Sequence, residues 1–216
     1  MNDIQSVLFD ADGTLIDTYD IILTSMRYAV NDVLGCSLDD AELMAGVGTP
    51  LYDQMLHFTG GDEARATEIT QIYRDHNDGV HDARIRAFGD TKAALERFQA
   101  AGIPMGVVTS KRHAMAQRGL EMSGIAGYFQ FLIGHDDWPE HKPAPGPILR
   151  GCELLGTAPE RSLYVGDSPF DIQAGNAAGC ATAAALWGMF PREALAAERP
   201  TFMCDSLTEL ADRLGI

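Results

Sequence analysis

The sequence predicts an α/β fold, in which a doubly wound parallel sheet forms a core and an inserted α-helical bundle forms a cap. Two patterns lead to this prediction. From Asp90 onward, short apolar runs alternate with stretches of helical periodicity, which is the rhythm of parallel β–α–β units. Residues 18–83 carry only helical periodicity, and they follow one isolated strand pattern. Because that first strand must join the later sheet, we expect the helical block to be an insertion.

The amino-terminal part opens with a strand over residues 3–10, where an apolar run ends at two acidic residues. Apolar residues at helical spacing then predict a helix over residues 19–34. Ser37 is expected to cap the next helix, whose first turn is acidic. Two further helices are expected over residues 51–58 and from Glu63 to about Val80, separated by glycines.

The carboxyl-terminal part alternates between helix and strand patterns. Glycine ends several of the helical patterns, as expected for a residue that adopts the left-handed C-cap conformation, and proline opens one of them. The expected helices cover residues 91–101, 113–123, 145–155, 171–178 and 207–214. The expected strands cover residues 104–108, 129–133, 162–165, 181–185 and 201–203. This order predicts a Rossmann-like core in residues 1–15 and 86–216, with the cap in residues 16–85.

The composition excludes several classes of protein. The chain of 216 residues has a formal net charge of −15, which argues against nucleic acid and anionic membrane surfaces as partners. Its four cysteines are widely spaced, which fits buried thiols in a reducing compartment. No signal segment is evident, and no apolar run approaches the ~18 residues of a membrane helix. We therefore expect a cytoplasmic protein that is a monomer or a weak homodimer.

The residues best suited to chemistry follow the predicted strands. Asp10 and Asp12 end the first strand, and two carboxylates this close repel each other unless a cation lies between them. A hard, oxygen-preferring ion such as Mg²⁺ fits this need. Three later loops supply Thr109-Ser110-Lys111, His141-Lys142-Pro143 and Gly166-Asp167 with Asp171. Ligands bind at the carboxyl ends of strands in open α/β sheets, so these groups are expected to converge on one rim and to suit phosphoryl transfer.

These residues resemble the motifs of the haloacid dehalogenase-like hydrolases. The similar segments are Asp10-Ala11-Asp12-Gly13-Thr14-Leu15-Ile16-Asp17-Thr18, Val107-Val108-Thr109-Ser110-Lys111, Lys142-Pro143, and Gly166-Asp167 with Asp171. They span most of the chain in the order in which that family carries them. The helical insertion directly after the first motif resembles the small helical cap of its phosphatase branch.

The resemblance implies a role for each residue. Asp10 would be the nucleophile and a Mg²⁺ ligand, and Asp12 the general acid and base, with its backbone carbonyl on the metal. Thr109 would bind the transferring phosphoryl group, and Lys142 would neutralise the nucleophile and the phosphate. Asp167 would be a metal ligand, and Asp171 would complete the metal site directly or through water. The backbone N–H groups of Ala11, Asp12 and Ser110 would donate to the phosphate.

The implied reaction is Mg²⁺-dependent hydrolysis of a small anionic phosphorylated substrate through an aspartyl-phosphate. Residues 161–180 resemble phosphoglycolate phosphatases most, whereas the cap segments Tyr73-Arg74-Asp75-His76-Asn77 and Val80-His81-Asp82 resemble bacterial pyrophosphatases of the same family. The expected activity is that of a phosphoglycolate phosphatase, and an inorganic pyrophosphatase is the alternative. A sugar-phosphate phosphatase or mutase and a catalytically idle regulatory protein are more remote alternatives.

The cap is where substrate choice is expected to lie. Gly48, in the loop over residues 46–50, is expected to reach the substrate. His81, with His76 and Arg84, is a candidate contact for a second phosphate or a carboxylate. The other interpretation of these three residues is a solvated helix face.

Overall fold

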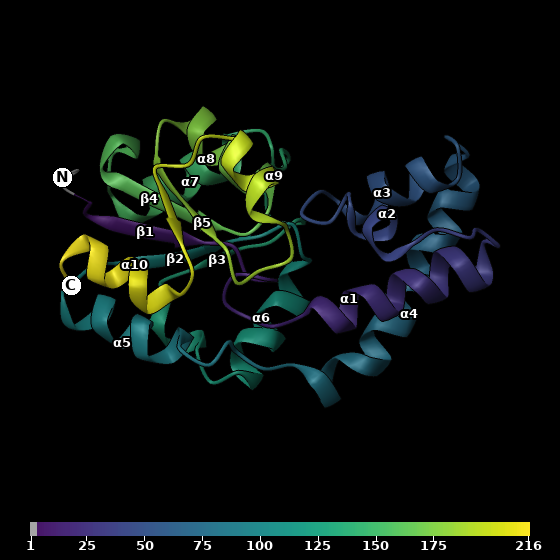
Figure 1. Cartoon of the computed structure of the whole chain (residues 1–216), viewed down its shortest axis with the longest axis horizontal. Coiled ribbons are helices and arrows are strands. Elements are labelled where there is room, and N and C mark those ends of the chain that lie inside the picture. Colours follow the sequence, from purple (N-terminus) through teal and green to yellow (C-terminus); the bar gives the residue numbers. More distant parts are fainter. Residues whose placement is uncertain (1–3) are drawn as a thin grey trace.

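The computed structural model describes residues 4–216. Residue 3 of the expected first strand and residues 1–3 of the expected core therefore lie outside the described residues. The protein has two parts, a sheet with flanking helices and a separate group of helices (Figure 1). A six-stranded parallel sheet has the order β3-β2-β1-β4-β5-β6, which is the doubly wound arrangement that the sequence predicts. Its strands are β1 (Ser6–Phe9), β2 (Met105–Val108), β3 (Leu132–Ile133), β4 (Ser162–Gly166), β5 (Ala181–Ala185) and β6 (Phe202–Cys204).

Helices cover both faces of this sheet. One face packs against α5 (Thr91–Ala100), α6 (His113–Met122) and α10 (Leu207–Leu214), and the other packs against α7 (Gly146–Leu155) and α8 (Pro169–Ala178). Side chains alternate along each strand, so Val7 and Phe9 enter the first layer while Leu8 enters the second. Such a strand is apolar along its whole length because both of its faces are buried.

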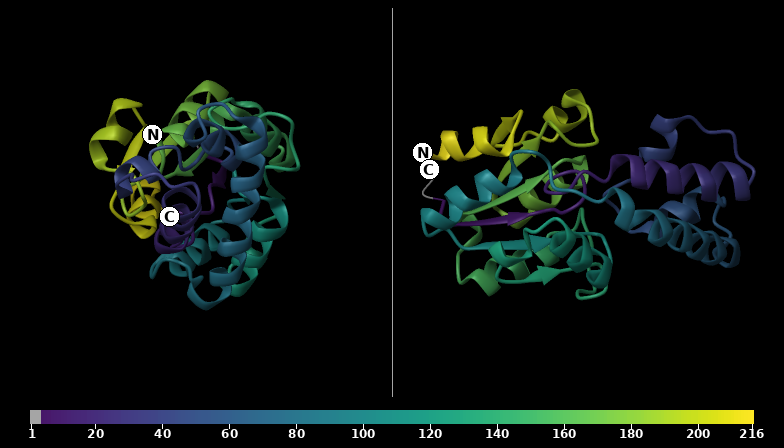
Figure 2. Two further views of the ribbon diagram at one scale, coloured as in Figure 1. Left: turned by 90° about the vertical axis from the view of Figure 1, so that its right-hand side faces the viewer. Right: turned by 90° about the horizontal axis from the view of Figure 1, so that it is seen from below.

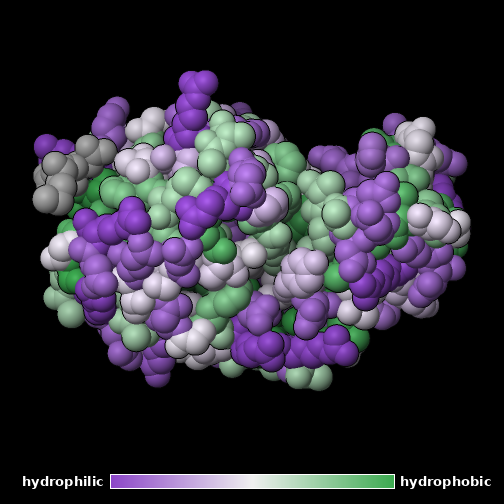
Figure 3. Space-filling model, viewed as in Figure 1, coloured by the Kyte–Doolittle hydropathy of each residue, from purple (hydrophilic) through white to green (hydrophobic). Residues whose placement is uncertain are grey.

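The helical part consists of α1 (Tyr19–Met26), α2 (Asp40–Met44), α3 (Leu51–Phe58) and α4 (Glu63–Arg84). The first of these continues as a π-helix over Arg27–Val33, within the single helical pattern seen in the sequence. These helices enclose an apolar cluster of their own, centred on Met26, Leu43, Met55 and Ile69. The right panel of Figure 2 shows this part extending away from the sheet, and Figure 3 shows a hollow between the two parts along one edge of the molecule.

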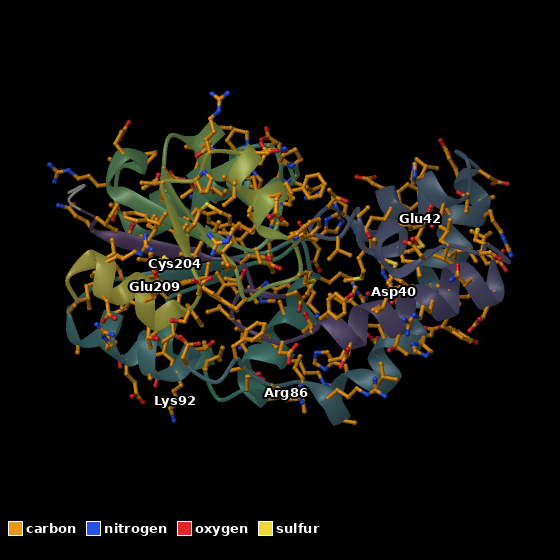
Figure 4. The ribbon with its side chains drawn as sticks, viewed as in Figure 1. Asp40, Glu42, Arg86, Lys92, Cys204 and Glu209 are labelled. Atoms are coloured by element: carbon orange, nitrogen blue, oxygen red, sulfur yellow. The ribbon has the colours of Figure 1, made fainter. Side chains whose placement is uncertain are left out.

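Two antiparallel linkers join the parts. Ile16 pairs with Ala87, and the N–H of Asp17 donates to the carbonyl of Arg86 at 2.9 Å. The Arg86 guanidinium also donates to the Asp17 carboxylate at 3.0 Å, and Figure 4 shows Arg86 where the chain returns to the sheet. The segment that leaves the sheet part and the segment that returns to it therefore lie side by side. Among residues 4–216, no helix combines the length and apolar character needed to cross a lipid bilayer.

Several local expectations need correction. Asp39, not Ser37, caps α2, because Asp39 and Glu42 form a reciprocal capping box. The strand expected over residues 129–133 is shorter than predicted. β3 covers only Leu132–Ile133, and residues 129–131, which follow a 3₁₀ turn over Ala126–Tyr128, are irregular. A further short helix, α9 (Arg192–Ala197), lies in a stretch that the sequence left unassigned. α4 also extends one turn beyond its expected end at Val80.

Candidate active site

Four loops meet at the carboxyl edge of the sheet. Asp10 and Asp12 follow β1, Thr109 follows β2, and Asp167 follows β4. Because β1 lies between β2 and β4 and runs parallel to both, these loops emerge side by side. The long connection after β3 brings Lys142 to the same edge, where its ammonium contacts Asp10.

Lys142 is the buried cation of the site, with only 3% of its surface exposed. Its ammonium lies 2.9 Å from Asp10 Oδ1 and 2.6 Å from Asp171 Oδ1. Burial by itself lowers the pKa of this lysine, but the charges of Asp10 and Asp171 outweigh burial and raise the pKa well above its ordinary value. Lys142 is therefore a fixed positive charge between two carboxylates.

Asp10 is almost fully buried beneath the loops. Burial raises the pKa of its carboxyl to about 6, since the lowering effect of Lys142 is only partial and Asp171 opposes it. The Oδ1 atom of Asp10 lies 2.9 Å from the Lys142 ammonium, and no other donor reaches it within residues 4–216. A buried acceptor in this state has capacity for a further cation or donor.

Each carboxylate oxygen of Asp167 accepts a hydrogen bond from a neighbouring residue. The Thr14 hydroxyl donates to Oδ1 at 3.2 Å and the Met189 N–H donates to Oδ2 at 2.7 Å. Burial raises its pKa well above the ordinary value, and the charges of Asp171 and Asp10 add to this effect. A Cβ atom at Gly13 or Gly188 would overlap this carboxyl, so both positions need glycine.

Asp171 differs from Asp10 and Asp167 because both of its carboxylate oxygens already accept hydrogen bonds from the protein. Its Oδ1 accepts from Lys142 at 2.6 Å and from the Tyr164 hydroxyl at 3.2 Å. Its Oδ2 accepts from the N–H and the hydroxyl of Ser168, at 3.0 and 2.6 Å, in the capping box that opens α8. With four donors around it, Asp171 is positioned chiefly to hold Lys142 and the loop.

Together the three acids form a cluster that could bind a metal ion. Asp10, Asp167 and Asp171 are all buried, and one carboxylate oxygen of each lies within 4.8 Å of the others. Carboxylate oxygens are hard ligands suited to Mg²⁺ or Ca²⁺ rather than to zinc. Lys142 is the one cation beside Asp10, and the raised pKa values of Asp10 and Asp167 fit a site that a further cation would neutralise.

Asp12 has a partner that the sequence interpretation did not identify. The Lys111 ammonium donates to both carboxylate oxygens of Asp12, at 2.9 and 3.0 Å. Both side chains are largely buried, with 14% and 17% exposed. From the sequence, Lys111 was as easily a surface charge, and only the meeting of the β1 and β2 loops assigns it to Asp12.

The expected phosphate-binding groups lie beside these acids. Thr109 is buried, and its hydroxyl accepts the N–H of Lys111 at 3.3 Å. Within residues 4–216, the backbone N–H groups of Ala11, Asp12 and Ser110 have no hydrogen-bond acceptor. The Ser110 hydroxyl donates to the carbonyl of Gly48 at 2.7 Å, which connects the sheet to the helical part.

A cavity of about 120 Å³ lies between the sheet edge and the helices. Asp10, Asp12, Thr109 and Asp167 line one side of it, and Gly48 lines the other, as expected. This volume is small beside the roughly 300–1,000 Å³ of drug-sized ligand pockets, which favours a small ligand.

The other expected cap residues do not line the cavity. His81 is fully buried, with Nδ1 3.0 Å from Asp82 Oδ1, and it packs near Gly119 of α6. His76 stacks on Tyr28, with ring centroids 4.6 Å apart, and Arg84 is exposed at the end of α4. The expectation that His81 contacts substrate is therefore not met, because that turn of α4 has passed the cavity and contacts α6. Arg74 and Asn77, earlier on α4, do line the cavity.

Comparisons with known proteins agree with this geometry. A family model described as haloacid dehalogenase-like hydrolase matches residues 7–185. A Clostridium perfringens protein named "Putative pyrophosphatase PpaX" is 39% identical over 97% of this chain and 96% of its own. The Anoxybacillus flavithermus protein named pyrophosphatase PpaX is 33% identical over 99% and 98%.

Solved structures give the same fold. A Haemophilus somnus protein described as a predicted phosphoglycolate phosphatase superposes with a TM-score of 0.88, at 25% identity over 99% of both chains. A Bacteroides fragilis haloacid dehalogenase-like hydrolase reaches a TM-score of 0.89, at 26% identity over 96% of this chain and 99% of its own.

Proposed function

Because the chain belongs to the haloacid dehalogenase-like hydrolases, we propose that it is a Mg²⁺-dependent phosphohydrolase that cleaves inorganic pyrophosphate through an aspartyl-phosphate. The observation that carries this proposal is the meeting of Asp10, Asp12, Lys142 and Asp167 at one sheet edge beside a small cavity.

The residues present fit a magnesium ion. Asp10 and Asp167 would hold it through their carboxylates, and Asp12 would hold it through its backbone carbonyl. Asp171, whose oxygens already accept four hydrogen bonds, would act through water and by holding Lys142. When bound, the ion would neutralise charge on the nucleophile and on the phosphate oxygens.

The chain's own groups then account for the bond changes. The Asp10 carboxylate attacks phosphorus, and the bond from phosphorus to the bridging oxygen breaks. Asp12, protonated and released from its pairing with Lys111 at this stage, gives its proton to the leaving phosphate. It then takes a proton from the water that attacks the acyl phosphate. The second step releases the other phosphate and regenerates Asp10, so one water yields two phosphates.

The remaining groups hold the transferring phosphoryl group. The Thr109 hydroxyl would donate to its oxygens, as would the N–H groups of Ala11, Asp12 and Ser110, which have no acceptor within residues 4–216. The Lys142 ammonium, fixed between Asp10 and Asp171, balances the negative charge that gathers there.

We assign residues 16–85 to a cap that closes over the cavity and residues 1–15 with 86–216 to the catalytic core. The paired linkers at Ile16–Ala87 and Asp17–Arg86 would serve as the hinge. Closure would exclude water from the reacting phosphate.

Two substrates compete for this site. Pyrophosphate is favoured by the two relatives named as pyrophosphatases, which are the more similar proteins in sequence and match the cap as well as the core. Phosphoglycolate is supported by the Haemophilus somnus structure and by the likeness of residues 161–180. Both molecules are small and carry two anionic groups, so the same cavity suits either.

A direct assay tests the proposal. Purified protein with Mg²⁺ is offered pyrophosphate, phosphoglycolate and p-nitrophenyl phosphate in parallel, with a chelator control. We expect phosphate release that needs Mg²⁺ and the highest kcat/KM with pyrophosphate. Faster turnover of phosphoglycolate would select the second substrate, and no release from any of the three would reject the enzyme assignment.

A further inference from the structure

Two arginines line the cavity alongside the catalytic carboxylates. Arg74 comes from α4 in the helical part, and Arg112 comes from the loop before α6 in the sheet part. The catalytic scheme above uses neither of them. Since the two arginines come from different parts of the molecule, an anion between them would contact both the cap and the core.

Arg74 has no carboxylate in direct contact among residues 4–216. Within residues 4–216 its guanidinium forms no hydrogen bond or ion pair, although it is half-buried. Burial lowers its pKa, and the neighbouring charge of Arg112 lowers it further, more than Asp78 and Asp136 compensate. Two arginines close enough to repel each other beside a cavity are stabilised when an anion binds between them.

Arg112 is only loosely engaged. Its nearest carboxylate is Asp78, at 3.8 Å, and both side chains are partly exposed, at 39% and 45%. This contact is too long to be a hydrogen bond, so the guanidinium keeps its donors for a ligand. Asp78 also lines the cavity, on α4.

His135 adds an independent observation. It lines the same cavity, and its Nδ1 atom is buried without a hydrogen-bond partner among the described residues. Burial lowers the pKa of His135, and the charges of His141 and Arg74 lower it further, so Arg74 also lies near this ring. Arg74, Arg112 and His135 thus line one cavity, and among residues 4–216 the one carboxylate within 4 Å of these side chains is that of Asp78.

We propose that Arg74 and Arg112, with His135 beside them, form a second anion subsite that binds the non-reacting phosphoryl group of a diphosphate substrate. The inference rests on the proposed phosphohydrolase function and names the residues that select the substrate. A planar guanidinium can bind two phosphate oxygens at once, whereas an uncharged leaving group offers nothing to either arginine. The subsite therefore favours pyrophosphate over simple phosphate monoesters.

Kinetics of matched variants test the subsite. Arg74→Gln and Arg112→Gln each remove one cavity cation, and Arg65→Gln removes one cation from the same helix α4 outside the cavity lining. With pyrophosphate, we expect each cavity variant to raise KM by about 10- to 100-fold, the effect of losing a charge-assisted hydrogen bond. With p-nitrophenyl phosphate, which has one phosphate, we expect kcat/KM to stay within about threefold.

Binding gives a second measurement that needs no turnover. Calorimetry at fixed free Mg²⁺ compares methylenediphosphonate, which carries two phosphonates, with methylphosphonate, which carries one. The wild-type chain should bind the diphosphonate more tightly, and Arg74→Gln should lose most of that preference while Arg65→Gln retains it. Arg112→Gln provides an independent check of the same subsite.

The two measurements separate the possible failures. If the wild-type chain does not hydrolyse pyrophosphate, the proposed function fails, but the binding comparison still decides whether the subsite exists. Equal losses on both phosphonates, no loss on either, or the same effect from Arg65→Gln would overturn the subsite. A KM change with p-nitrophenyl phosphate as large as that with pyrophosphate would also overturn it.

Discussion

Lys142→Met removes the cation that holds two buried carboxylates together. In the native protein the ammonium lies 2.9 Å from Asp10 and 2.6 Å from Asp171, and Lys142 is 3% exposed. Removing one partner of a buried ion pair costs about 3–5 kcal/mol, because the remaining charge is left without compensation. Methionine has a similar volume and shape, so little of this loss would come from a cavity.

Urea unfolding measures this cost. In metal-free buffer near pH 7.5, a slope of about 2 kcal/mol/M converts the loss into a midpoint lower by about 1.5–2.5 M, with the slope itself unchanged. Arg27→Met serves as the control, since Arg27 and Asp40 form an exposed ion pair with side chains 52% and 47% exposed. That pair is expected to contribute little.

The destabilisation caused by Lys142→Met should itself depend on pH, and the pKa of Asp10 gives the direction. The folded-state pKa of Asp10 is already raised to about 6 from its ordinary 3.8, although Lys142 lowers it. Without Lys142 that pKa rises further, so between pH 3.8 and the folded-state pKa the native state binds more protons than the unfolded state. Stability then falls as pH rises through this window. We therefore expect Lys142→Met to be less destabilising at pH 5 than at pH 8.

A second substitution sharpens this test. Replacing Asp171 by asparagine in the Lys142→Met background removes one of the two uncompensated charges, and it should recover part of the lost stability. A midpoint for Lys142→Met that matches the wild type, or one lowered no more than that of Arg27→Met, would refute the electrostatic account of the site.

Four other predictions concern the same edge of the sheet. Asp10→Asn should abolish phosphate release while the thermal unfolding curve stays cooperative, and retained turnover would exclude Asp10 as nucleophile. Mg²⁺ affinity measured by calorimetry should fall about tenfold for each pH unit below about pH 6, because Asp10 takes up a proton there. A Mg²⁺ affinity that does not change with pH would contradict this. Gly188→Ala should weaken Mg²⁺ binding more than it weakens folding, because its Cβ would overlap Asp167; unchanged Mg²⁺ affinity would contradict the close contact. Ser110→Ala, which loses the bond to the Gly48 carbonyl, should change KM by up to about tenfold, and a loss confined to kcat would contradict a role in shaping the cavity.

Most of the sheet could be predicted from the sequence. The boundaries of β5 and α10 coincide with the expected ranges, because a buried parallel strand is apolar along its length and a helix ends clearly at glycine. The length of β3 was overestimated, because an edge strand pairs on one side only and its apolar residues extend beyond the paired segment. α9 was missed because its short pattern, Arg192–Ala197, carries only one buried apolar residue.

Part of the candidate site followed from sequence because strand order fixes it. Asp10, Thr109, Lys142 and Asp167 each follow a strand, and parallel neighbours deliver their loops to one edge. The pairing of Lys111 with Asp12 did not follow, since a lysine in a loop is equally consistent with a solvated surface.

The residues of the helical part that line the cavity are the part of the site that the sequence predicts least well. Helical periodicity identified α4 and its apolar face, but Arg74, His81 and Arg84 lie at different places along one long helix. Only the docking of this helix against the core brings Arg74 into the cavity, buries His81 near α6 and leaves Arg84 exposed. The sequence by itself determined the sheet and which side chains meet at its edge, because these depend on local periodicity and on strand order. The tertiary structure decided which residues of the helical part line the cavity, because that depends on how those helices pack against the sheet part.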